Sequence, residues 1–209
     1  MGLRGLLCLV VGVCISISTL AAEVVFEPRT ASMADILALQ QGGFVIFIRH
    51  AATDTRRPDQ FPIQLHDCSL QRPLSEEGRA QARMLGQYFQ QLALPIAEVR
   101  VSPMCRAIET AELAFGSADV RVDPLTHYIA GMTEEEKAPI LVRTRELLST
   151  LPPSGNRVLV AHGPNIAELM DYFPPEASVV ILQPQGSGNF HYVASILMDD
   201  WPALLSALD

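Results

Sequence analysis

A short apolar run at residues 44–48 is the clearest structural signal in this chain. It contains β-branched and aromatic residues and ends abruptly at Arg49, so it predicts a strand buried on both faces of a sheet. Five further strands are predicted at residues 97–101, 120–122, 157–161, 178–182 and 190–197. The last two are expected to form a closing hairpin.

Between the predicted strands, apolar residues recur at helical spacing. The best-defined helix follows Ser75, a favourable N-cap residue, and carries Glu76 and Glu77 at the positive end of its dipole. Its apolar positions are Ala82, Leu85, Phe89 and Leu92. This alternation predicts an α/β fold, a single-domain three-layer α/β/α sandwich with a mostly parallel central sheet and helices on both faces. A chain of 209 residues is long enough for one such core.

The first 22 residues have the composition of an export signal. Arg4 supplies positive charge, residues 5–20 are apolar or small, and residues 19–22 suit a signal peptidase. The alternative, a membrane anchor, is weaker because the run is only as long as a minimal span and contains small and hydroxyl residues. We expect residues 1–22 to be a signal peptide and residues 23–209 to form one domain of a periplasmic or secreted protein, with no stable membrane insertion after cleavage.

The charge and the cysteines narrow the choice of partners and compartment. A formal net charge of -8 argues against a nucleic-acid partner, which demands clustered positive charge. Export would leave Cys68 and Cys105 in an oxidising compartment, where a disulfide between them is expected and would contribute roughly 4 kcal/mol by loop closure. Two separate buried thiols are the alternative.

Polar residues follow three of the predicted strands directly. Arg49 and His50 end the first strand, Arg106 lies in the first turn of a helix expected to start at Ser102, and His162 ends the fourth strand. The carboxyl ends of parallel strands meet at one edge of an open α/β sheet, where ligands bind. The sequence therefore predicts that two imidazoles and two guanidinium groups converge there.

The blocks that carry these residues resemble the three signatures of the histidine phosphatase superfamily, in its phosphoglycerate-mutase-like branch. In order they read Phe47-Ile48-Arg49-His50-Ala51-Ala52-Thr53, Ser102-Pro103-Met104-Cys105-Arg106-Ala107-Ile108-Glu109-Thr110-Ala111 and Val160-Ala161-His162-Gly163. The resemblance implies that His50 is a nucleophile that becomes phosphorylated. It also implies that Arg49, Arg106 and His162 complete the phosphate pocket and that Thr53 touches the transferred phosphate.

The chemistry of phosphoryl transfer suits these residue types. The transition state spreads charge over three equatorial oxygens, which the permanently charged forks of two arginines can hold. A neutral imidazole can attack phosphorus and split one displacement into two easier ones. We therefore expect an enzyme that needs no cofactor and no metal, and the histidines show no His-Glu-x-x-His pattern of a metallohydrolase.

The chain departs from the family pattern at two positions. Ala51 stands where the family usually has glycine after the catalytic histidine. His127 stands where the family usually has the glutamate that protonates the leaving group, so His127 is our first candidate for that acid and a loop histidine without a role is the alternative. Asp54 and Asp123 are the other candidate donors.

Taken together, the sequence predicts an exported phosphatase that hydrolyses small phosphomonoesters through a phosphohistidine on His50. Arg57, with Arg56 beside it, is a candidate for binding a second anionic group of the substrate, and a solvated surface is the alternative. A phosphoglycerate-mutase-like phosphotransferase is the second enzymatic hypothesis. A phosphate-recognising module without an efficient general acid is the non-enzymatic one.

Overall fold

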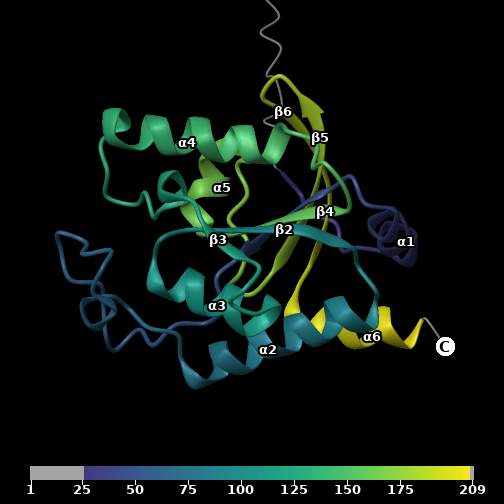
Figure 1. Cartoon of the computed structure of the whole chain (residues 1–209), viewed down its shortest axis with the longest axis horizontal. Coiled ribbons are helices and arrows are strands. Elements are labelled where there is room, and N and C mark those ends of the chain that lie inside the picture. Colours follow the sequence, from purple (N-terminus) through teal and green to yellow (C-terminus); the bar gives the residue numbers. More distant parts are fainter. Residues whose placement is uncertain (1–25, 208–209) are drawn as a thin grey trace, which may run out of the picture.

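The computed structural model describes residues 26–207, and the predicted signal peptide at residues 1–22 lies outside them. One six-stranded sheet, in the order β3-β2-β4-β1-β5-β6, crosses the molecule (Figure 1). Its strands are β1 (Val45–Arg49), β2 (Ile96–Val101), β3 (Val120–Val122), β4 (Asn156–Ala161), β5 (Val179–Gly186) and β6 (Asn189–Ile196). The first four in the sheet run parallel, and β5 pairs antiparallel with both β1 and β6, so the predicted mostly parallel sheet is confirmed.

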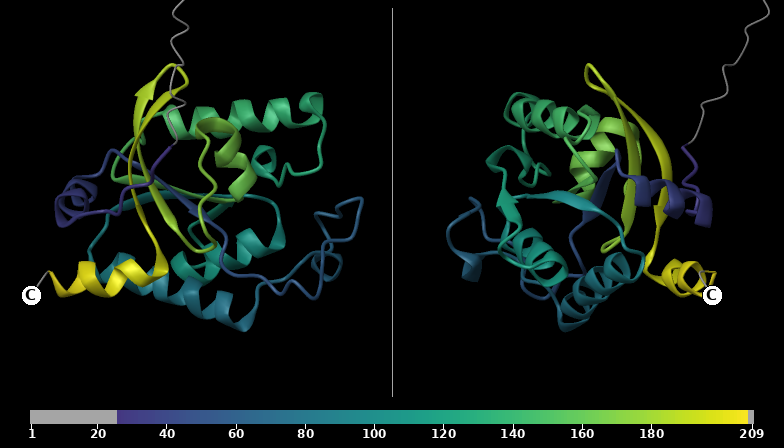
Figure 2. Two further views of the ribbon diagram at one scale, coloured as in Figure 1. Left: turned by 180° about the vertical axis from the view of Figure 1, so that it is seen from behind. Right: turned by 45° about the vertical axis from the view of Figure 1, so that its right-hand side comes forward.

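Helices cover both faces of this sheet, as the sequence predicted. The α-helices are α1 (Met33–Gln41), α2 (Glu76–Gln91), α3 (Cys105–Phe115), α4 (Glu134–Ser149), α5 (Gly163–Met170) and α6 (Trp201–Ser206). Short 3-10 turns are η1 (Cys68–Leu70), η2 (Pro124–Thr126) and η3 (Met198–Asp200). Helices α2, α3 and α6 lie on one face and α4 and α5 on the other, which makes three layers (Figures 1 and 2).

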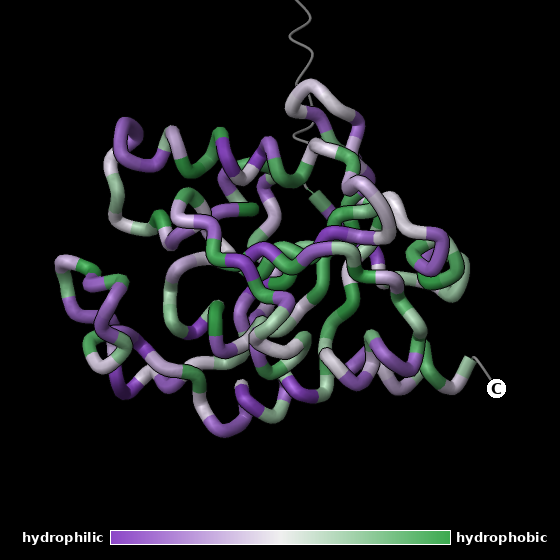
Figure 3. Tube along the Cα trace, in the orientation of Figure 1, coloured by the Kyte–Doolittle hydropathy of each residue, from purple (hydrophilic) through white to green (hydrophobic). Residues whose placement is uncertain are grey.

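The buried strand β1 contributes side chains to both hydrophobic cores. Ile46 and Ile48 point into the core under α2, α3 and α6, while Val45 and Phe47 point into the core under α4 and α5. All four side chains are fully buried, because alternate residues of a strand face opposite sides of a sheet. Along the outer helices, hydrophobic and hydrophilic residues alternate, as amphipathic helices require (Figure 3).

The pairing of the parallel strands fixes the edge where the polar residues emerge. Arg49 pairs with Ala161, and Val101 pairs with Val160. The backbone N–H of His50 donates to the Ala161 carbonyl at 3.0 Å. The residues that follow β1, β2 and β4 therefore leave the sheet side by side.

Helix α3 begins later than its sequence predicted. We expected Ser102 to cap the helix, but α3 starts at Cys105 with Met104 as its N-cap. The Ser102 hydroxyl is instead 2.7 Å from Nε2 of His162, and it accepts the Met104 N–H at 3.3 Å. A contact between distant parts of the chain thus replaces the local cap, and Arg106 still lies in the first helical turn.

A long loop between β1 and α2, residues 53–72, projects beside α3 (Figure 1). The predicted disulfide is present: Cys68 is bonded to Cys105, with their Cα atoms 5.7 Å apart. The Cys105 N–H also donates to Oε1 of Gln71 at 2.9 Å. Both contacts join the loop to the first residue of α3, next to Arg106.

None of the described helices combines the length and apolar character needed to cross a bilayer.

Candidate active site

His50 lies directly beyond β1 with a free, neutral ring nitrogen. Its Nδ1 is 2.9 Å from the Ala51 carbonyl, which can only accept, so Nδ1 carries the proton and Nε2 keeps its lone pair. Only 2% of the residue is exposed. Burial, followed by the charge of Arg106, lowers the pKa of His50 to about 3, so the imidazole is neutral near pH 7.

His162 caps α5 and is completely buried. Its ring centroid lies 5.3 Å from that of His50. The Ser102 hydroxyl accepts the Met104 N–H, and its own hydrogen has Nε2 of His162 as its acceptor among the described contacts, which assigns the His162 proton to Nδ1. That Nδ1 is buried and has no hydrogen-bond partner among the described residues. Burial lowers the pKa of His162 well below its usual value, so its ring is a neutral donor.

Arg106 is a fully buried cation in the first turn of α3. Its Nη1 donates to Oδ1 of Asp59 at 3.0 Å, and its Cζ lies 5.2 Å from the ring centre of Tyr128. Its Nε and Nη2 are buried without a partner in the described part of the chain. One edge of the guanidinium is thus held by a carboxylate, and the other edge is free to bind an anion in a bidentate manner.

Arg49 enters the same region from the end of β1. Its Nη1 donates to the Pro174 carbonyl at 2.8 Å, and its guanidinium lies 4.8 Å from the ring centre of Phe173. Its Nη2 is 3.7 Å from Oε1 of Glu176. The Nε atom is buried, and no described residue bonds to it.

The structure brings the four predicted side chains to one edge of the sheet. The charges of Arg49 and Arg106 both lower the pKa values of His50 and His162, which requires the four groups to be close in space. Together they present buried donors without partners: Nε of Arg49, Nε and Nη2 of Arg106, and Nδ1 of His162. Orphaned donors of this kind are costly unless a ligand satisfies them, and a phosphate oxyanion would do so.

Three charged residues that the sequence did not single out also belong to this site. Arg72 is half-buried, and its charge lowers the pKa values of Arg49, Arg106 and His50. Asp59 contacts Arg106. Glu176 accepts from the Thr53 hydroxyl at 3.0 Å and lies 3.9 Å from Nδ1 of His50. No local pattern marks any of them, because the loops that carry them are placed by the tertiary fold.

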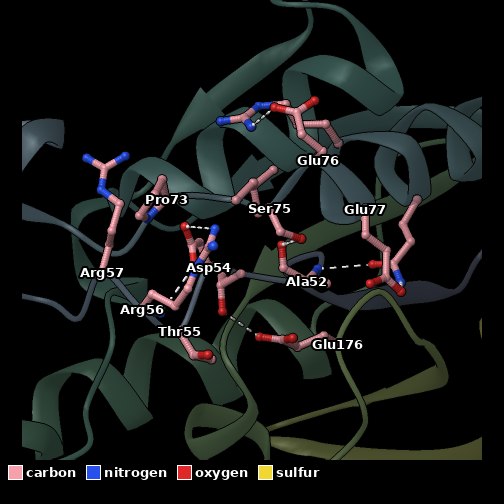
Figure 4. A pocket seen from close by; sticks show the side chains of 14 residues that line it. Ala52, Asp54, Thr55, Arg56, Arg57, Pro73, Ser75, Glu76, Glu77 and Glu176 are labelled. Carbon is pink, nitrogen blue, oxygen red and sulfur yellow. Dashed lines mark hydrogen bonds and ion pairs between the residues drawn. The ribbon is translucent and has the colours of Figure 1, made fainter.

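The two predicted substrate-binding residues border a neighbouring cavity of about 800 Å³. Thr53, predicted to touch phosphate, is buried and donates to Glu176 in this unliganded structure. Arg57 is exposed, and in Figure 4 its guanidinium turns away from Asp54 and Glu176. The structure therefore leaves Arg57 outside the cluster formed by His50 and its neighbours, and its predicted role stays a prediction.

The candidate proton donors named from the sequence lie at the margin of the site or outside it. His127 is half-buried beside His162, and burial lowers its pKa, which favours the neutral ring. Asp54 is ion-paired with Arg56 at 2.8 Å, and this pairing lowers the pKa of Asp54. The Asp123 carboxylate is paired with Arg143 on α4 at 2.8 Å. Both aspartates thus already have fixed cationic partners.

No cluster of three or more metal-ligating side chains occurs in residues 26–207. Histidine, aspartate and glutamate are present at the site. Asp59 pairs with Arg106, and Glu176 lies near both Arg49 and Nδ1 of His50. The donors that face inward are N–H groups, which bind anions.

One family model matches part of the chain that contains the site. The model of the histidine phosphatase superfamily (branch 1) matches residues 45–127, a range that contains Arg49, His50 and Arg106. This match agrees with the resemblance of the first two sequence blocks, and the third block, at residues 160–163, lies beyond the matched range. No curated protein matches it by sequence.

Solved structures share the fold at low sequence identity. The protein histidine phosphatase SixA, complexed with tungstate, is 20% identical, with a TM-score of 0.50 and coverage of 75% of this chain and 98% of its own. The alpha-ribazole phosphatase from Shigella flexneri is 13% identical, with a TM-score of 0.52 and coverage of 74% and 96%. These similarities establish a common α/β architecture.

Proposed function

We propose that this protein is a phosphatase that hydrolyses phosphomonoesters through a phosphohistidine on His50. The observation that carries the proposal is a neutral imidazole with a free Nε2 beside two guanidinium groups, each of which has buried N–H donors without a partner among the described residues: Nε of Arg49, and Nε and Nη2 of Arg106. A nucleophile without its own proton and a preformed set of donors are what in-line phosphoryl transfer needs.

The proposed mechanism gives each of these residues one role. A phosphate dianion binds to the free edge of Arg106, to Nε of Arg49 and to Nδ1–H of His162. Nε2 of His50 attacks phosphorus, an N–P bond forms and the bond to the leaving oxygen breaks. The Ala51 carbonyl holds the proton on Nδ1 and keeps the ring in the reactive tautomer. Water then attacks the phosphohistidine and releases phosphate.

Export from the cytoplasm is part of the same proposal. The signal-like residues 1–22 lie outside the described structure, so the support comes from the sequence and from the Cys68–Cys105 disulfide. Disulfides persist in oxidising compartments and are rare in the cytosol. We propose a periplasmic or secreted location, where the substrates are small phosphorylated compounds of the envelope or its surroundings.

The function can be tested by measuring phosphate release from p-nitrophenyl phosphate after the protein has been treated with excess EDTA. We expect turnover at the same rate before and after treatment, because arginines and a histidine supply all the charge that the proposed mechanism uses. A protein that releases no phosphate, or one that loses activity with EDTA and regains it with a divalent cation, would refute the proposal.

A further inference from the structure

The chain lacks the carboxylic acid that its family places after the third strand, yet a buried carboxylate reaches the site from another direction. Asp59 belongs to the long loop of residues 53–72, and its side chain is only 8% exposed. Its Oδ1 accepts from Nη1 of Arg106 at 3.0 Å and from the backbone N–H of Arg72 at 2.8 Å. This carboxylate therefore lies directly beside the guanidinium that we expect to hold the phosphate.

The surroundings of Asp59 have room for a leaving group. A cavity of about 220 Å³ lies here, lined by Thr55, Pro58, Asp59, Phe61, Arg72 and Tyr128. Both Asp59 and Tyr128 contact Arg106. The cavity thus adjoins Arg106 on the side of Asp59 and Tyr128, and the substituent of a phosphate bound to Arg106 could extend into it.

Other carboxylates are less well placed. Asp54 and Asp123 are each paired with an arginine outside the cluster. Glu176 lies 3.9 Å from Nδ1 of His50, which is not the attacking nitrogen, and it is engaged by Thr53 and Arg49. In an in-line displacement the leaving oxygen departs on the side of phosphorus opposite Nε2. A donor that adjoins Arg106 and the cavity therefore fits better than one beside Nδ1.

We propose that Asp59 is the proton donor to the leaving group and that the cavity beside it is the leaving-group subsite. This inference rests on the proposed phosphatase function. As the P–O bond breaks and the N–P bond to His50 forms, the carboxylic acid of Asp59 transfers its proton to the departing oxygen. In the second half-reaction the resulting carboxylate takes a proton from the water that attacks phosphorus, so protons balance over the cycle.

Substrate binding favours uptake from solvent of the proton that this step needs. In the unliganded protein the Asp59 carboxylate is paired with Arg106. A phosphate dianion on the same guanidinium adds a second negative charge at close range, and two neighbouring anions favour one shared proton between them. The proton is thus present when the phosphate is present and is located between the acid and the ester.

The loop owes its position to covalent and polar contacts. The Cys68–Cys105 disulfide and the hydrogen bond from the Cys105 N–H to Gln71 tie it to α3, one residue from Arg106. These contacts keep the loop, and with it Asp59, against α3 although few residues of the loop are buried. A tethered loop can therefore present an acid as reproducibly as a strand end does.

The test compares leaving groups that do and do not need protonation. For Asp59→Asn we expect kcat/KM on phenyl phosphate to fall by about 10²-fold or more, and kcat/KM on dinitrophenyl phosphate to stay within about threefold of the parent protein. The value of kcat/KM reports formation of the phosphoenzyme, the step in which the leaving group departs. Asparagine keeps the size and the Oδ1 acceptor of the side chain, and it removes the transferable proton together with the negative charge that faces Arg106.

The matched control is Asp67→Asn, in the same loop. Asp67 caps η1 through Ser69, a role that asparagine also fills, and we expect unchanged kinetics on both substrates. Calorimetric titration with inorganic phosphate checks that the pocket is intact, and Asp59→Asn is expected to bind at least as tightly as the parent because a competing carboxylate is gone.

Four results would overturn the inference. Equal losses on the two substrates, or lost phosphate binding, would mean that Asp59 only positions Arg106. No loss on phenyl phosphate would remove Asp59 from the mechanism. A leaving-group-dependent loss in Glu176→Gln but not in Asp59→Asn would assign the proton to Glu176. A parent protein that hydrolyses neither substrate would refute the phosphatase function itself, and the inference with it.

Discussion

Replacement of His50 by alanine is expected to reduce phosphate release from p-nitrophenyl phosphate by about 10⁴-fold or more, because no other group can take the nucleophile's place. The His50 ring is buried, it is neutral, and its proton is fixed on Nδ1 by the Ala51 carbonyl. Alanine removes the attacking atom and leaves the arginines in place. Steady-state rates measured with phosphate detection give the ratio directly.

His66→Ala is the matched control for this substitution. His66 is an exposed histidine in the loop of residues 53–72, and we expect its loss to change the rate by less than a factor of about two. Inorganic phosphate should still bind to His50→Ala, since the donors of Arg49, Arg106 and His162 remain. A His50→Ala protein with more than about a tenth of the parent activity would show that the nucleophile lies elsewhere.

Replacement of Arg106 by lysine is expected to lower kcat/KM by about 10²- to 10³-fold, even though the positive charge is kept. Arginine has one edge on Asp59 and a second, free edge with two parallel N–H donors. Lysine is a point charge that cannot serve both edges at once. Because the ammonium can still pair with Asp59, the buried carboxylate is not left without a partner, and the fold should persist.

Arg83→Lys tests whether the loss is specific to the site. Arg83 is exposed on α2, and we expect the same exchange there to leave kcat/KM unchanged. Thermal unfolding of both variants shows whether each is folded at the assay temperature. Parent-like kinetics in Arg106→Lys would contradict the proposed bidentate contact, because charge alone would then be sufficient.

The parts of the fold that depend on local pattern could be predicted from the sequence. β1 has the continuous apolar composition of a strand with two buried faces, and Ser75 caps α2 through the Gly78 N–H. Every apolar position predicted for that helix is buried, including Leu85 and Phe89. The convergence of Arg49, His50, Arg106 and His162 follows from one topological rule, that parallel strands share a carboxyl edge.

The rest of the site depends on contacts between distant segments. Glu176 reaches His50 because the chain returns antiparallel into β5, where the Ala177 N–H donates to the His50 carbonyl at 3.1 Å. Ser102 leaves its expected capping position because His162 bonds to it. Asp59 is held by Arg106, which is 47 residues away in the chain. Periodicity and capping rules describe residues that are close in the chain, so they cannot predict these contacts.

Local rules failed where the chain departs from regular structure near the site. A serine followed by proline normally starts a helix, but here the hydroxyl of Ser102 forms a hydrogen bond with the buried His162 instead. Such conflicts between local preference and observed structure are expected at functional positions. The delayed start of α3 is consistent with a site at this edge of the sheet.

We propose that His50 carries the phosphoryl group between the two half-reactions, and trapping the phosphohistidine is the direct test. The protein is mixed with dinitrophenyl phosphate, quenched in alkali within the first turnover, digested, and analysed by mass spectrometry under conditions that preserve phosphohistidine. We expect one phosphoryl group on the peptide that contains His50 and none in His50→Ala. A phosphoryl group on another residue, or a burst of dinitrophenol with no phosphorylated peptide, would contradict it.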